Sequence, residues 1–235
     1  MKIVGFFYKT LTKKYYIIMN IEINVPTSLN EITLEQYQKF LKVAEENQEG
    51  SFLNAKMIEI FCGIPLSDSY KLKMSSVEAI VDILTDMLNE TPTHIDKFTL
   101  NGTQYGFIPD LDEMSLGEYV DLDGNSSDWQ KMHIAMNVLY RPIVTSRAGK
   151  YNIEEYTADD SEKMKAMPLG AAIGSLFFFY NLGIELSKHT ILYSSNQEQM
   201  EIIQEQLISQ QSGDGTHQFL VSLEEMLENL KISLN

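Results

Sequence analysis

The chain has 235 residues, of which 44% are hydrophobic, so it can bury a core, and disorder over its whole length is not expected. Its 33 acidic and 18 basic residues give a net charge of −15, which repels nucleic acid phosphates and anionic membranes and favours a basic partner. The single cysteine, Cys62, excludes an intrachain disulfide framework and is interpreted as a core residue, since it ends an apolar run.

Residues 1–18 differ from the rest of the chain because they carry four lysines and no acid. Their apolar run is shorter than the roughly 7–15 residues of a signal peptide, and Lys13 and Lys14 follow it instead of a cleavage motif. Two interpretations stay open. The segment is either a basic arm, with Lys13 and Lys14 docking on an acidic neighbour, or a start upstream of the natural one at Met19.

Residues 19–142 are predicted to form a helical domain. Capping boxes predict helix starts at Thr33, Ser75, Ser115 and Ser127. A further helical stretch is predicted within SFLNAKMIEIFCGI at 51–64, where Gly63 and Pro65 stop the helix. Alternating apolar residues around Asn101–Gly102 predict one β-hairpin near 97–108.

The segment 143–167 is polar and is interpreted as an irregular connection between two parts of the chain. Residues 168–235 then form a helical C-terminal part, with an apolar helix over 168–193, a capping box at Ser195 and a last helix near 217–231. The predicted fold class is mostly α: a helical domain with one inserted β-hairpin, followed by a helical C-terminal subdomain.

Residues 166–184 carry no charge, so their length approaches the roughly 20 residues of a membrane span. Pro168, three glycines and the lack of a positive flank favour a buried central helix, and no membrane partner is expected. Gly170 and Gly174 would let another helix approach closely, while Phe178 belongs to a bulky run beside them. These three residues are interface candidates.

The stretch DLDGNSSDW at 121–129 raises the question of a calcium loop. Asp121, Asp123 and Asn125 fit the first ligand positions of an EF-hand, but Ser126 replaces its glycine and Met132 its bidentate glutamate. The stretch is therefore interpreted as a joint between two helices, in which the glycine and asparagine allow a turn. No metal ion is expected there.

Charge is divided sharply around this joint. Seven acids and no base occupy 98–130, and four bases and no acid occupy 131–153, including the only two arginines, Arg141 and Arg147. Arginine is enriched in interface cores, so Arg141, Arg147 and Lys150 are interface candidates. The alternative is that Arg141 neutralises a helix end and Arg147 is simply solvated.

Motifs typical of enzymes are missing from the sequence: it has no phosphate-binding glycine loop, no nucleophile elbow and no histidine pair at metal spacing. We therefore expect a non-enzymatic protein with no cofactor. A metal-dependent enzyme that uses the acids of 110–128 stays open as the alternative of another class.

Three stretches carry a resemblance to known proteins. They are ITLEQYQKFL at 32–41, MSLGEYVDLD with WQKMHIAMNVLYRPI at 114–123 and 129–143, and FFFYNLGIEL at 177–186. Together they resemble proteins encoded among the structural genes of tailed bacteriophages, especially crAss-like phages. The resemblance covers roughly residues 20–187 and consists of helix and cap patterns, so it carries over no catalytic residue.

The resemblance implies a virion component assembled in the cytoplasm of the bacterial host: a ring, neck, tail or packaged cargo protein. Its expected partners are other phage structural proteins in a multi-copy assembly, without direct contact to nucleic acid. A tail assembly chaperone that leaves the finished particle is the alternative of the same class.

Overall fold

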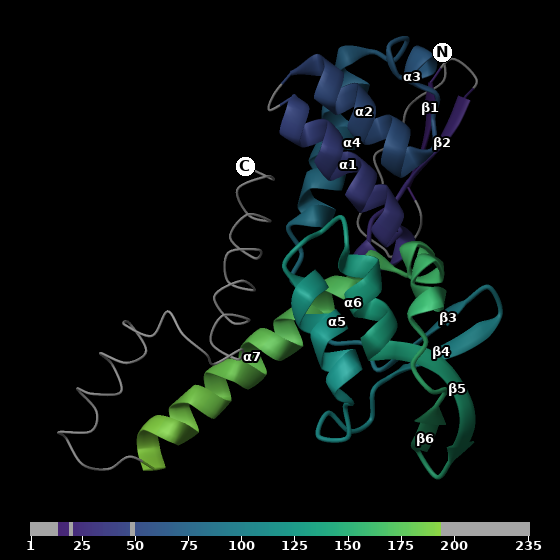
Figure 1. The fold of residues 1–235 in the computed structure, drawn as a ribbon. Coiled ribbons are helices and arrows are strands. Elements are labelled where there is room, and N and C mark those ends of the chain that lie inside the picture. Colours follow the sequence, from purple (N-terminus) through teal and green to yellow (C-terminus); the bar gives the residue numbers. More distant parts are fainter. Residues whose placement is uncertain (1–13, 19–20, 48–49, 194–235) are drawn as a thin grey trace.

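The structure, a computed structural model, describes residues 14–18, 21–47 and 50–193 (Figure 1). One end of the molecule holds the helices α1 (Leu34–Glu46), α2 (Ser51–Cys62), α3 (Leu66–Ser69) and α4 (Met74–Leu88). An antiparallel ribbon of β1 (Lys14–Ile18) and β2 (Ile21–Val25) lies beside them, followed by the 3-10 helix η1 (Leu29–Glu31). Lys13, the capping box at Ser195 and the helix expected near 217–231 lie outside the described residues.

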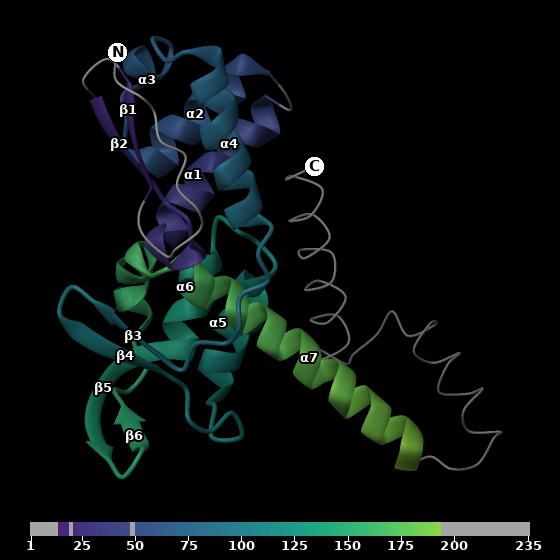
Figure 2. The ribbon, with the colours of Figure 1, turned by 180° about the vertical axis from the view of Figure 1, so that it is seen from behind.

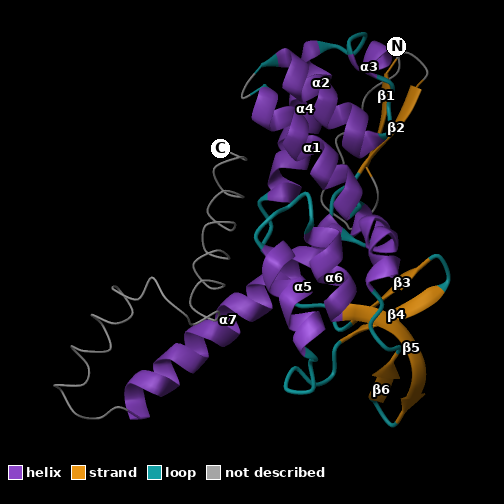
Figure 3. Ribbon diagram, in the orientation of Figure 1, coloured by secondary structure: helices purple, strands orange, loops and turns teal. Residues whose placement is uncertain are grey.

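The other end of the molecule holds an antiparallel sheet (Figure 3). Its strands are β3 (Lys97–Leu100), β4 (Thr103–Phe107), β5 (Tyr140–Arg147) and β6 (Lys150–Ile153), in this spatial order. The helices α5 (Leu116–Ser126) and α6 (Met132–Leu139) lie between this sheet and the α1–α4 group. A second 3-10 helix, η2 (Ala158–Ala166), leads into α7 (Leu169–Tyr193), which projects away from the body (Figure 2).

The predicted hairpin is confirmed at its turn. Asn101 and Gly102 both have positive φ, of 50° and 81°, which is the geometry that a two-residue type I′ turn demands. The strands pair Lys97 with Gly106 and Leu100 with Thr103. Because such a ribbon is marginal alone, its pairing with β5 supplies the support that it needs.

The predicted fold class, mostly α with one inserted hairpin, is wrong. The described part of the chain holds a four-stranded sheet and a separate two-stranded ribbon, and the segment 143–167 forms β5, β6 and η2 instead of an irregular connection. Proline is typical of the end of a helix, and α6 does end at Leu139, but Pro142 itself lies within β5 opposite Tyr105. The division of the chain into two parts at this segment stays a prediction.

Local chemistry explains why β5 and β6 form. Ile143, Val144 and Thr145 are β-branched and favour a strand. Proline has no N–H to donate within a sheet, and it is tolerated where the pairing is irregular, as it is between Ile143 and Thr145. The carbonyl oxygen of Pro142 still accepts the N–H of Glu154 at 2.9 Å. The turn uses Ala148 and Gly149, with φ of 51° and 81°, so it repeats the first hairpin's geometry without its Asn-Gly signature.

Two of the predicted helix starts in the described residues are confirmed and two are wrong. Thr33 and Ser115 each cap a helix through a complete capping box. Ser75 lies inside α4, which begins at Met74, and Ser127 is the C-terminal cap of α5. Residues 121–126 of the predicted joint are therefore helical, and the connection to α6 is shorter than expected.

Two backbone hydrogen bonds connect the start of α7 to the start of α1. Leu34 N donates to Met167 O at 3.0 Å, and Leu169 N donates to Ile32 O at 2.9 Å. The buried apolar side chains form one connected cluster that runs from Ile23 to Leu176. The predicted apolar helix over 168–193 is confirmed as α7. Within the described residues, no helix combines the length and hydropathy that a membrane crossing requires.

Candidate functional site: a lysine-lined pocket and the surfaces around it

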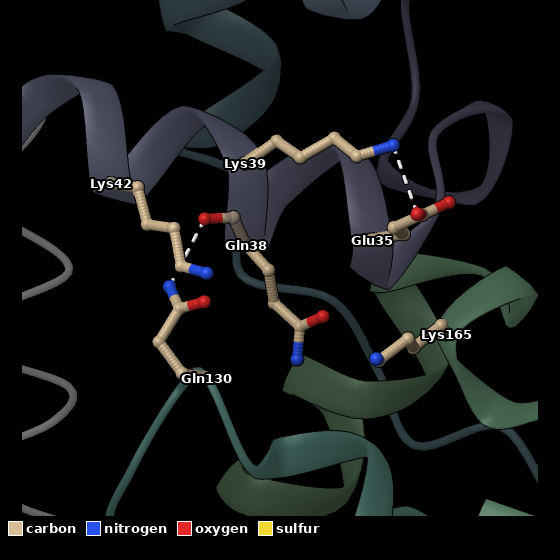
Figure 4. A pocket seen from close by; sticks show the side chains of 6 residues that line it. All are labelled: Glu35, Gln38, Lys39, Lys42, Gln130 and Lys165. Atoms are coloured by element: carbon tan, nitrogen blue, oxygen red, sulfur yellow. Dashed lines mark hydrogen bonds and ion pairs between the residues drawn. The ribbon is translucent and has the colours of Figure 1, made fainter. Parts of the chain in front are cut away.

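A pocket of about 190 Å³ opens beside α1 (Figure 4). The capping box of Thr33 starts this helix, and four polar residues at spacings of three and four positions then share one of its faces. The connection between α5 and α6, together with η2, supplies the opposite wall. The lining residues are Glu35, Gln38, Lys39, Lys42, Gln130 and Lys165.

Hydrogen bonds to the backbone fix the floor of the pocket. Gln38 Nε2 donates to Trp129 O at 2.7 Å, and Gln130 Nε2 donates back to Gln38 O at 3.0 Å. Nδ1 of the buried His133 lies 3.4 Å from Gln38 Nε2, and its Nε2 lies 3.3 Å from Glu162. Burial, and then the nearby Lys165 ammonium, lower the pKa of His133.

The lysines of the pocket differ in how they are paired. Lys39 Nζ lies 2.9 Å from Glu35, and Lys165 Nζ lies 2.7 Å from Glu162. Lys42 has no carboxylate partner among the described residues. In Figure 4, Lys39 reaches away from the floor toward Glu35, while Lys165 points from η2 toward the amide of Gln38.

Arg141, an interface candidate from the sequence, lies inside the molecule. Its Nη1 is 2.8 Å from Glu118 Oε1, and the two side chains are 11% and 9% exposed. Burial alone would raise the pKa of Glu118, but the hydrogen bonds from Ser115 and the Arg141 charge hold it below its usual value. The guanidinium therefore joins β5 to α5 within the chain.

The other basic candidates are distributed differently. Arg147 and Lys150 are exposed at the two ends of the β5–β6 turn. Lys14 begins β1, opposite Val25, and Lys13 lies outside the described residues. Among the described candidates, Lys14, Arg147 and Lys150 do not join Arg141 in one basic patch.

Gly170 and Gly174 do permit a close approach, but the neighbours that approach them belong to this chain. A Cβ on Gly174 would lie 2.7 Å from the carbonyl oxygen of Thr93, and one on Gly170 would overlap the Asn30 side chain. The approaching elements are the connection before β3 and the 3-10 helix η1, not another helix.

Phe178 follows on the same helix and packs among aromatic rings. Its ring is stacked on His94 with centroids 4.8 Å apart, and it meets Phe107 edge-on at 5.6 Å. Phe107 also contacts Tyr140, whose hydroxyl donates to Ile95 O at 2.6 Å. Phe178 thus helps to hold α7 against the sheet, and its ring remains partly exposed.

The acids of 110–128 have separate uses. Asp110 accepts from the N–H of Asp112 at 3.0 Å, Asp121 accepts from the hydroxyl of Tyr156 at 2.6 Å, and Asp128 accepts from Gln130 N at 2.8 Å. Across residues 14–18, 21–47 and 50–193, no three His, Cys, Asp or Glu side chains gather as a metal site requires.

An exposed apolar face on α5 was not recognised in the sequence. Leu116, Tyr119 and Val120 occupy its first turns and are 79%, 43% and 57% exposed. Tyr119 stands at the position where the Ser115 cap predicts a covered hydrophobic staple, but its side chain is exposed. The signal in the sequence is that apolar residues occur on two faces of α5. In the structure Leu122 is buried, whereas Leu116, Tyr119 and Val120 are exposed.

Sequence reasoning also missed the pocket. The polar face of α1 reads as an ordinary solvated surface, and Lys165 comes from the segment that was expected to be irregular. The spacing of Gln38, Lys39 and Lys42 on one helix was the available signal.

Comparison of the chain with protein-family models, with curated proteins and with solved structures finds no match.

Proposed function

We propose that the chain is a non-enzymatic bacteriophage virion component, such as a ring, neck, tail or packaged cargo protein, that acts through protein–protein contacts. The three stretches that carry the resemblance to phage structural proteins support this role. Two of them contribute most of α1, α5 and α6, which hold the candidate surfaces. The role requires a surface for a neighbouring protein.

The exposed face of α5 is the observation that carries the proposal. A fully buried Leu or Val side chain stabilises a protein by roughly 1.5–3 kcal/mol, and Leu116 and Val120 forgo most of that gain. Single exposed apolar residues are common, but three within two turns of one helix form a patch. A partner that covers the patch would bury these side chains and so supply the stabilisation that the isolated chain lacks.

The surroundings of this face indicate the chemistry of the partner. Asp112, Glu113 and Asp123 are exposed next to it. The complementary surface is therefore apolar at its centre and carries basic side chains at its rim. We assign that surface to another structural protein of the same particle.

Mass spectrometry of purified particles tests the role. We expect the chain to be present in every particle at a fixed number of copies. Its absence from finished particles, together with its presence in assembly intermediates, would contradict the proposal and support a tail assembly chaperone instead.

The double variant Leu116→Ser/Val120→Ser tests the face. Because both side chains are exposed, we expect the unfolding free energy to change by less than about 0.5 kcal/mol while incorporation into particles falls. Val144→Ser is the matched control, because Val144 is 55% exposed on β5, away from α5. Equal incorporation of both variants would remove the face from the proposal.

A further inference from the structure

The pocket beside α1 is basic although the chain is acidic. Its lining contributes three lysines and one glutamate, whereas the whole chain has 33 acidic and 18 basic residues. A concave site with a net positive charge concentrates groups of the opposite sign. The pocket therefore attracts an anionic group to a molecule whose general surface repels anions.

The size of the pocket limits what can enter it. Sites for cofactors and drug-sized ligands measure roughly 300–1,000 Å³, and this one measures about 190 Å³. A nucleic acid strand would also meet the acidic surface outside the pocket. A carboxylate-bearing side chain fits both the volume and the charge.

Two lysines of the pocket already pair with carboxylates in this structure. Lys39 contacts Glu35 and Lys165 contacts Glu162, but these acids are 49% and 71% exposed. Exposed ion pairs are worth little, so a competing carboxylate can replace them at low cost. Lys42 has no carboxylate partner within the described part of the chain and is available from the start.

The pocket is also held in shape before any ligand arrives. The bonds between Gln38, Gln130 and the Trp129 carbonyl tie α1 to the α5–α6 connection. A preorganised site spends less of its binding energy on ordering its own groups.

We propose that this pocket binds the carboxylate side chains of an acidic protein segment presented by a neighbouring subunit. Lys42 and Lys165 supply the charges that the segment meets, and the two glutamines keep their supporting elements in place. This inference deepens the proposed function and rests on it only for the origin of the neighbour.

Calorimetric titration of the isolated chain with two capped peptides tests the proposal. One peptide carries alternating glutamate and glycine, and the other has glutamine at each glutamate position. We expect only the first to bind, with an affinity that weakens as salt rises. Its binding should also change the fluorescence of Trp129, the single tryptophan, whose carbonyl oxygen accepts from Gln38 at the floor.

The variant Lys42→Gln/Lys165→Gln removes the two charges. If each contributes about 0.5–1 kcal/mol, the two together raise the dissociation constant roughly fivefold to thirtyfold. Lys71→Gln is the matched control. Lys71 contacts Asp68, three positions before it, at 2.7 Å, just as Lys165 contacts Glu162, but Lys71 does not line the pocket. The urea-unfolding curve of each variant verifies that it is folded.

The outcomes separate cleanly. Unchanged affinity in the double variant, equal binding of both peptides, or no binding by the glutamate peptide would each overturn the proposal. A titration with inorganic phosphate distinguishes a free anion as the occupant: tighter binding of phosphate than of the peptide would also overturn it. The titrations use the isolated chain and no particles. A negative result in them therefore overturns the pocket proposal without contradicting the virion role, which mass spectrometry of particles tests separately.

Discussion

Arg141 and Glu118 join the sheet to α5 through a largely buried ion pair, with 2.8 Å between Nη1 and Oε1. The other carboxylate oxygen of Glu118 accepts the N–H of Ser115 at 2.7 Å, so one side chain both caps α5 and neutralises the guanidinium. The pair fixes the N-terminal turn of α5, where the exposed Leu116 lies. The arginine that the sequence suggested as a contact residue thus supports the proposed contact surface from inside the protein.

Replacing Arg141 should be costly. Arg141→Met leaves the Glu118 carboxylate nearly buried without its cation, and breaking such a pair from one side costs about 3–5 kcal/mol. Since Glu118 stays at the margin of the surface, we expect roughly 3 kcal/mol, measured as the loss of unfolding free energy in urea. Arg147→Met is the control: Arg147 is exposed, so its change should stay within about 0.5 kcal/mol. Similar losses in both variants would contradict the role of the pair.

The glycines of two helices give opposite predictions for the same substitution. At Gly174 of α7 an added Cβ meets the Thr93 carbonyl oxygen at 2.7 Å, and backbone cannot move aside easily. We expect Gly174→Ala to lower the unfolding free energy by about 1–3 kcal/mol. At Gly124 of α5 the space is open, so Gly124→Ala should raise it by about 0.5–1 kcal/mol. A stabilising Gly174→Ala would show that α7 does not lie against the connection before β3.

The elements that the sequence predicted correctly are those with a local signature. The capping boxes at Thr33 and Ser115 and the turn at Asn101–Gly102 each satisfy backbone groups within a few residues. Ser75 has the same signature but forms no cap, because α4 begins at Met74 with Lys73 as its cap residue. A serine can cap only where the chain enters the helix, and tertiary contacts set that point.

The sheet and the pocket depend on contacts between distant residues. β5 forms because its start pairs with β4, thirty-odd residues earlier, where Phe107 faces Tyr140. The pocket requires Gln130 to reach the backbone of Gln38 across 92 residues. The sequence pattern contains neither contact, so it predicts an irregular connection over 143–167 where β5 and β6 form, and by itself it does not reveal the pocket.

Cys62 should be unreactive in the folded protein. Burial raises the pKa of its thiol to about 12, so at pH 8 roughly one molecule in 10⁴ carries the thiolate that alkylating reagents require. We expect slow labelling by iodoacetamide in buffer and rapid labelling in urea, followed by mass spectrometry. Fast labelling of the folded chain would contradict the interpretation of Cys62 as a core residue.

His94 places a titratable group at the contact between α7 and the sheet. Its ring lies between Phe178 and Phe107, with centroids 4.8 and 4.5 Å away. Its Nδ1 is buried without a hydrogen-bond partner among the described residues, while its Nε2 lies 3.3 Å from the exposed carboxylate of Asp96. Burial lowers the pKa of His94 below its ordinary value of 6.5, and the Asp96 charge offsets this only in part.

The lowered pKa of His94 predicts that acid destabilises the fold. Below pH 6.5 the unfolded chain takes up a proton at His94 more readily than the folded chain does. The unfolding free energy therefore falls as the pH drops from 6.5 toward the pKa of the folded state. Above pH 6.5 this contribution to the unfolding free energy is fully present. We expect His94→Phe to flatten this dependence below pH 6.5 in urea titrations. Burial also lowers the pKa of His133, so His133→Gln should remove a separate part of the slope. An unchanged slope in both variants would show that acid acts through other groups.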